Sequence, residues 1–145
     1  MFKHILIAVD GSGHSQHAVT AAIGMAKQDG SDIFVLHVFE REVGRAGTFA
    51  VETPADASEI VSGVVGTLKQ AGISASGEVQ GAVAGHAAKH IVETAKSRGA
   101  DVIIMGSRGL SDIAGLLLGS VTHKVIQLSH TPVLVVREPE AKLGG

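Results

Sequence analysis

The chain has 145 residues, a length that fits one domain over residues 1–145 with a single buried core. Aromatic residues make up only 3% of it and its net charge is -2, so neither base stacking nor a broad basic surface favours nucleic acid or an anionic membrane as a partner. The absence of cysteine excludes disulfides, thiolate zinc sites and cysteine nucleophiles.

The amino-terminal residues argue against export. Met1–His4 leads directly into the apolar run Ile5–Val9, which is too short for the core of a signal peptide. No later apolar run approaches the roughly 18 residues of a membrane span. We therefore expect a soluble protein of the cytoplasm, where reducing conditions suit a chain without cysteine.

Apolar runs and helical repeats alternate in the first half of the chain. The continuous run Ile5–Val9 predicts a central parallel strand covered on both faces. Apolar residues at helical spacing from Ala18 to Ala26 predict a helix that Gly30 ends, and Ile33–Phe39 predicts a second strand.

The next segment, residues 40–54, has a mixed composition and no period, which predicts a long loop. Asp56 and Glu59 form a predicted capping box at the start of a helix. The apolar repeat Ile60–Leu68 lies in this helix, and Gly72 ends it.

Three more strands and two helices are predicted in the second half. Residues 73–80 alternate weakly, which suits a strand at a sheet edge, and Ala87–Ala95 repeats at helical spacing. Val102–Met105 predicts a buried strand, Val121–Leu128 a helix and Val133–Val136 a last strand. This alternation predicts an open parallel α/β sheet with right-handed crossovers.

In such sheets, ligands bind beyond the carboxyl ends of the strands, near the point where the strand order reverses. The predicted strands that end near Asp10, Val38 and Met105 therefore open onto one crevice. Asp10 suits the base or ribose of a nucleotide, and Val38 suits packing on a flat ring. As a simpler alternative, Asp10 caps the turn that follows it.

A glycine motif lies on the connection between the strand Val102–Met105 and the following helix. It consists of Gly106, Gly109 and, after nine further residues, Gly119-Ser120. Glycine lets backbone N–H groups approach a phosphate without a Cβ in the way, so these residues are candidate phosphate donors. Ser120 is also the predicted N-cap of the helix.

Arg108 lies inside the motif and is a candidate to supply a local positive charge to the phosphates. Two simpler interpretations stay open. Strand-end glycines often form turns without binding a ligand, and Arg108 alone is equally consistent with a solvated loop cation.

With these motifs, the chain resembles the universal stress protein family, and within it the members whose G-2x-G-9x-G-(S/T) motif is associated with ATP binding. The resemblance covers nearly the whole chain. It is carried by Lys3–Ser12, Ala100–Gly109, Leu116–Val121 and Thr131–Val136.

The resemblance implies a Rossmann-like fold, a parallel sheet of order 3-2-1-4-5, and a role as an ATP-binding regulator in stress adaptation. It implies a homodimer through the strand Val133–Val136, which as a sheet edge also invites pairing on physical grounds. It assigns residues to the adenosine and to the triphosphate: Ala8, Val9, Asp10, Val38 and Met105 to the former, and Gly106, Arg108, Gly109, Gly119, Ser120 and Val121 to the latter. A bound triphosphate normally carries Mg²⁺, held by phosphate oxygens and water.

Two other function classes stay open. Gly11–Gln16 nearly matches a dinucleotide fingerprint, with Glu40 as a ribose acid, which suggests a fragment of an NAD-type oxidoreductase. Against it, Gln16 replaces the third glycine and no room remains for a substrate domain. The other class is a nucleotide-free dimeric interaction module.

Catalysis is weakly indicated. His86 and His90 are spaced as metal ligands on a helix, but no third ligand is evident. Ser12 and His14 lack the Gly-x-Ser-x-Gly elbow of a hydrolase, and the chain has no P-loop motif. No residue is clearly placed as a base for an attacking water, so we expect no catalytic residues and, at most, slow ATP hydrolysis.

Overall fold

The computed structural model describes residues 1–41, 53–108 and 118–137, in which strands and helices alternate as predicted. The elements, in chain order, are β1 His4–Ala8, α1 Gly13–Asp29, β2 Asp32–Arg41, α2 Pro54–Gln70, β3 Ala75–Val83, α3 Ala87–Ser97, β4 Val102–Gly106, α4 Ser120–Leu128 and β5 Val133–Val136.

The strands form one parallel sheet of order β3-β2-β1-β4-β5, which confirms the predicted fold class and strand order. The order reverses at β1, which lies between β2 and β4. Ala8 at the end of β1 is in register with Leu36 of β2 and Met105 of β4. Because the strands are parallel, their carboxyl ends lie at the same end of the sheet.

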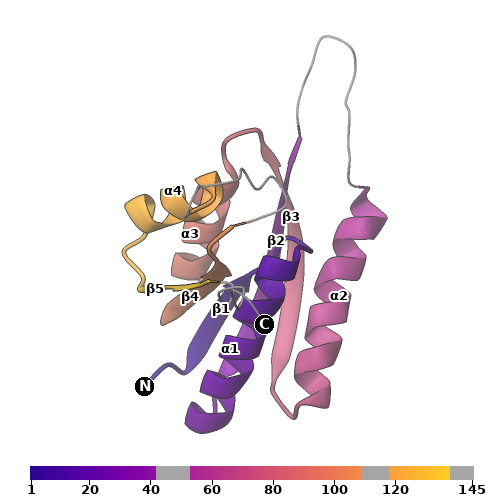
Figure 1. The fold of residues 1–145 in the computed structure, drawn as a ribbon, viewed down its shortest axis with the longest axis vertical. Helices are drawn as coiled ribbons and strands as arrows, with labels where there is room; N and C mark the ends of the chain where they lie inside the picture. The colour runs from indigo at the N-terminus through magenta and orange to yellow at the C-terminus, as the bar shows by residue number, and fades with distance from the viewer. Residues whose placement is uncertain (42–52, 109–117, 138–145) are drawn as a thin grey trace, which may run out of the picture.

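Helices cover both faces of the sheet, with α1 and α2 on one face and α3 and α4 on the other (Figure 1). Successive side chains of a strand point to opposite faces, so Ile5 and Ile7 pack under α1 while Leu6 packs towards α3. All three are almost completely buried, as expected of a central strand. Within the described residues, no helix has the length and apolar character needed to cross a membrane.

Two predictions for the segment between β2 and α2 are wrong. The capping box of α2 joins Thr53 and Asp56 rather than Asp56 and Glu59: the Asp56 N–H donates to Thr53 Oγ1 at 3.1 Å, and the Thr53 N–H donates to Asp56 Oδ2 at 3.0 Å. The predicted loop 40–54 starts too early, because pairing with β3 extends β2 to Arg41. The rest of that loop, residues 42–52, lies outside the described residues.

Asp101 fastens the amino end of β1 to that of β4. Its Oδ2 accepts hydrogen bonds from the backbone N–H groups of Lys3 and His4, both at 2.9 Å. The bond from His4 and then that from Lys3 hold the pKa of Asp101 below its ordinary value of 3.8. The ionised form is therefore favoured by folding, so Asp101 stabilises the fold above about pH 4 and ceases to do so as the pH falls through its lowered pKa.

We expect Asp101→Asn to lower the midpoint of thermal unfolding at pH 7, because a neutral amide oxygen is a weaker acceptor than a carboxylate. The difference from the wild type should shrink as the pH is lowered below about 4. Thermal unfolding scans from pH 2 to pH 7 measure this difference in midpoint. Glu93→Gln is the control, because Glu93 belongs to an exposed surface pair with Lys89. A difference that stays constant over that range would contradict this role of Asp101.

Candidate nucleotide-binding site

A cavity of about 340 Å³ lies where β1, β2 and β4 end and α4 begins. The structure brings nearly all of the predicted site residues to it, although they come from four separate segments of the chain. Its lining includes Ala8, Val9, Asp10, Val38, Met105, Gly106, Arg108, Gly119, Ser120 and Val121. Gly109, the remaining predicted residue, lies outside the described part of the chain.

Two hydrogen bonds hold the start of α4 against the end of β4. The Gly119 N–H donates to the Ser107 carbonyl at 2.7 Å, and the Thr122 hydroxyl donates to the Gly106 carbonyl at 2.9 Å. The chain that leaves β4 at Gly106 therefore returns to the same point at Gly119. This arrangement places the first turn of α4 on the wall of the cavity.

The N-cap of α4 is Gly119 rather than Ser120, so that prediction is wrong. The reason is that the Gly119 carbonyl already accepts the helical bond from the His123 N–H at 3.0 Å. Ser120 is the first helical residue, and its side chain makes no hydrogen bond within the described part of the chain. Within the described residues, the N–H groups of Ser120, Val121 and Thr122 have no acceptor, which is the arrangement that binds anions at helix N-termini.

At the end of β1, Asp10 organises the turn into α1. Its Oδ1 accepts hydrogen bonds from the Ser12 N–H at 2.9 Å and the Ser12 hydroxyl at 2.5 Å, and Ser12 is the N-cap of α1. The alternative prediction that Asp10 caps the turn after it is therefore confirmed by these two bonds to Ser12. Asp10 also lines the cavity.

His37 lines the cavity and was not predicted as a site residue. Its side chain is only 2% exposed, and Nδ1 lies 2.7 Å from the Val9 carbonyl. Because a carbonyl oxygen only accepts, Nδ1 carries the proton and donates. The signal in the sequence is the one histidine in the apolar run Ile33–Phe39, which a purely hydrophobic strand would not need.

Glu40 of β2 and two residues of α3 line another side of the cavity. The Glu40 carboxylate accepts the Gly85 N–H at 2.7 Å, so this predicted ribose acid of the dinucleotide alternative is bonded to the protein's own turn. Ala87 and Ile91 of α3 add apolar lining. His90, considered above as a metal ligand, has its Nδ1 2.9 Å from the Gln80 amide oxygen, and no cluster of three metal-ligating residues occurs in the ranges described.

The lining thus divides into an apolar and a polar part. Val38, Met105 and Ile91 present apolar side chains suited to the faces of a flat ring. Arg108 and the first turn of α4 present positive charge and N–H donors suited to an anion. A molecule with a flat ring at one end and an anionic group at the other matches both parts.

The parallel sheet with helices on both faces and a cavity at the switch in strand order define a Rossmann-like α/β domain. The family model for the universal stress protein family matches residues 1–137, and the chain belongs to that family. This confirms the resemblance found in the motifs.

Two relatives show how far the similarity extends. The universal stress protein YxiE of Bacillus subtilis is 35% identical over 94% of this chain and 100% of its own length. The universal stress protein MJ0531 of Methanocaldococcus jannaschii is 33% identical over 97% of this chain and 85% of its own.

Solved structures share the fold. Hypothetical protein MJ0577 superposes with a TM-score of 0.82 at 27% identity, over 97% of this chain and 99% of that one. A universal stress protein crystallised in complex with cAMP has a TM-score of 0.69 at 28% identity, over 95% of this chain and 98% of that one.

Proposed function

We propose that this protein binds ATP, with Mg²⁺ on the phosphates, in the cavity at the ends of β1, β2 and β4, and acts as a nucleotide-dependent regulator in stress adaptation. In this proposal, Ala8, Val9, Asp10, Val38 and Met105 surround the adenosine. The phosphates lie at the first turn of α4, beside Arg108 and the motif glycines.

The observation that carries the proposal is the first turn of α4. Its N–H groups at Ser120 and Val121 have no acceptor in the described chain, and these residues line the same cavity as the apolar side chains of Val38 and Met105. Phosphate binds at helix N-termini because the N–H groups and the helix dipole both favour an anion. The cAMP complex of a related protein supports an adenine nucleotide as the class of ligand.

We also propose that the protein is a cytoplasmic homodimer that pairs through β5. This strand ends the sheet order on the β4 side, and its Leu134 is 39% exposed. Edge strands with apolar side chains favour pairing with another strand, and a second copy provides an identical one.

Two measurements test ATP as the ligand. Mass spectrometry of the nucleotide released from denatured purified protein should detect ATP. In thermal unfolding, ATP with Mg²⁺ at about a hundredfold excess over its Kd should raise the midpoint by about 5 °C or more, and NAD should not. cAMP is the informative comparison, because it has the same base and ribose with one phosphate.

The outcomes separate the candidate functions. Equal stabilisation by NAD would favour the dinucleotide alternative, and stabilisation by cAMP alone would assign the site to a different adenine nucleotide. No response to any of the three, with no nucleotide released, would favour the nucleotide-free interaction module.

A further inference from the structure

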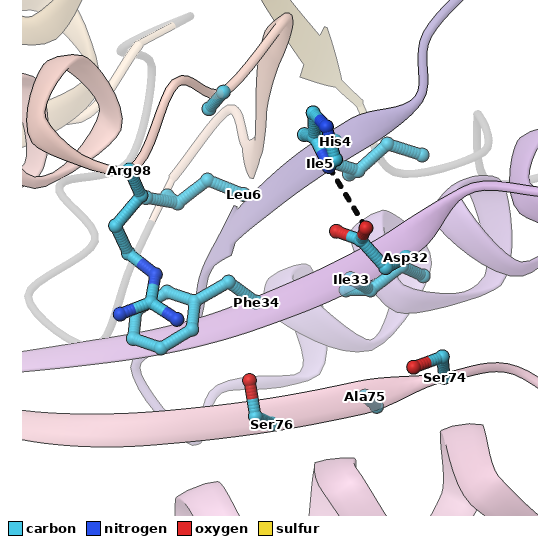
Figure 2. Close-up of a pocket in the computed structure, with 11 residues that line it drawn as sticks. His4, Ile5, Leu6, Asp32, Ile33, Phe34, Ser74, Ala75, Ser76 and Arg98 are labelled. Atoms are coloured by element: carbon cyan, nitrogen blue, oxygen red, sulfur yellow. Dashed lines mark hydrogen bonds and ion pairs between the residues drawn. The ribbon is translucent and has the colours of Figure 1, made fainter.

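A second cavity of about 340 Å³ lies at the amino ends of β1, β2 and β3 (Figure 2). It is at the opposite end of the strands from the first cavity. Its lining includes two rows of side chains on the sheet face that also carries α3. One row begins with His4 and Asp32, which are in register, and the next contains Leu6, Phe34 and Ser76, which are also in register.

Arg98 forms one side of this cavity. It is the C-cap of α3, and its guanidinium lies 3.5 Å from the centre of the Phe34 ring, stacked on it as Figure 2 shows. Stacking occupies the face of the guanidinium and leaves the N–H donors around its edge available. Within the described residues, the Arg98 side chain makes no hydrogen bond or ion pair.

His4 and Asp32 form a pair with each other. His4 Nδ1 lies 2.8 Å from Asp32 Oδ2 at the rim, drawn as the dashed line in Figure 2. Ser74 and Ser76 reach the cavity from the β3 side, and their hydroxyls have no partner in the described chain. Arg98 is therefore the charged group of this lining that lacks an acceptor, and hydroxyl donors lie in the same cavity.

We propose that this second cavity binds a small organic carboxylate with a flat apolar body. A carboxylate matches the fork of the Arg98 guanidinium, which donates two parallel hydrogen bonds to it. The apolar body packs against Ala100 and the small exposed part of Phe34, since Leu6 is fully buried. Asp32 at the rim disfavours a second negative charge on the ligand, so a monoanion fits better than a phosphate dianion.

The competing explanation is that Arg98 only shields Phe34, whose side chain is 8% exposed. Arg98→Met distinguishes the two, because methionine keeps an apolar stem over the ring and removes the donors. If Arg98 only shields Phe34, this variant changes stability alone. If Arg98 binds an anion, the Arg98→Met variant no longer binds a carboxylate more tightly than a neutral ligand.

The probes are 2-naphthoate and its neutral counterpart 2-naphthamide, titrated into the full-length protein and followed by NMR. We expect naphthoate to bind about tenfold more tightly than naphthamide, as one charge-assisted pair provides, and to shift the amide signals of Phe34 and Ser76. Arg98→Met should reduce naphthoate binding to the level of naphthamide. Arg98→Lys, which keeps the charge without the fork, should give an intermediate loss.

Arg41→Met is the matched control, because Arg41 also lies over a phenylalanine ring, Phe39, at 5.4 Å, but lines neither cavity. It should leave naphthoate binding unchanged. Absence of naphthoate binding to the wild type at 10 mM (roughly the weak limit of a specific site), equal binding of acid and amide, or unchanged binding by Arg98→Met would each overturn the proposal. None of these results depends on whether ATP binds at the first cavity.

Discussion

Replacing Gly119 by valine is expected to weaken ATP binding about a hundredfold while the protein stays folded. Gly119 lines the first cavity beside the N–H groups of Ser120 and Val121. The branched side chain would take space that phosphate oxygens need in order to reach these donors. Loss of two charge-assisted hydrogen bonds, each contributing about 1.5 kcal/mol, accounts for a decrease of that size.

The conformation of Gly119 makes this substitution a clean test. Its φ of -67° and ψ of 160° are readily adopted by valine, so no backbone strain is introduced. Gly24→Val is the matched control, because Gly24 lies in α1 away from the cavity lining and an added Cβ there meets nothing within 4 Å.

Calorimetric titration with ATP and Mg²⁺ measures the affinities. The Gly24→Val variant should bind as the wild type does, and Gly119→Ala should fall between the wild type and Gly119→Val. A folded Gly119→Val variant with wild-type affinity would show that the phosphates bind elsewhere.

Replacing Leu134 by lysine should convert the proposed dimer into a monomer. Leu134 is 39% exposed on β5, and pairing with a second copy would bury it. A lysine on an edge strand opposes pairing because its charge would be desolvated and would face the same charge across the two-fold axis.

Val135→Pro should have the same effect by removing a donor. In a parallel ladder, alternate residues of a strand bond to the same neighbour. The Ile103 N–H donates to the Pro132 carbonyl and the Ser107 N–H to the Val136 carbonyl, which directs the Val135 N–H away from β4. Proline at this position therefore leaves the pairing with β4 intact and removes a donor that a second copy would use.

Light scattering at tens of micromolar (roughly the range in which weak dimers form) distinguishes the dimer from the monomer. The wild type should have about twice the chain mass of 14.8 kDa, and both variants should have the mass of one chain. Val83→Lys is the control, because Val83 is 64% exposed on β3 at the opposite edge of the sheet and should leave the dimer intact. A monomeric wild type, or variants that stay dimeric, would contradict an interface through β5.

The strands and helices were predictable because burial imposes a pattern on the chain itself. A strand covered on both faces must be apolar at every position, and Ile5–Ile7 and Val102–Met105 are. The glycine motif was equally visible as a prediction of phosphate binding, because residues without a Cβ let a backbone approach a phosphate closely. These local requirements indicate the fold class and most of the first cavity.

The exact caps were less predictable, because several nearby residues can serve. Thr53 and Asp56 both suit an N-cap, and so do Gly119 and Ser120. Which one caps the helix depends on where the preceding chain enters. For α4 that entry is fixed by the bonds of Gly119 and Thr122 to the end of β4.

By itself, the sequence determines the order of elements and the apolar core, and its glycine motif predicts a ligand class, since each depends on residues close together in the chain. Only the tertiary structure decides that His37 donates to Val9, that Glu40 holds the turn at Gly85, and that Arg98 stacks on Phe34. Each of these contacts joins distant segments whose relative position is set by strand register and helix packing. No local pattern encodes that position, so the second cavity and its cation were outside the reach of sequence reasoning.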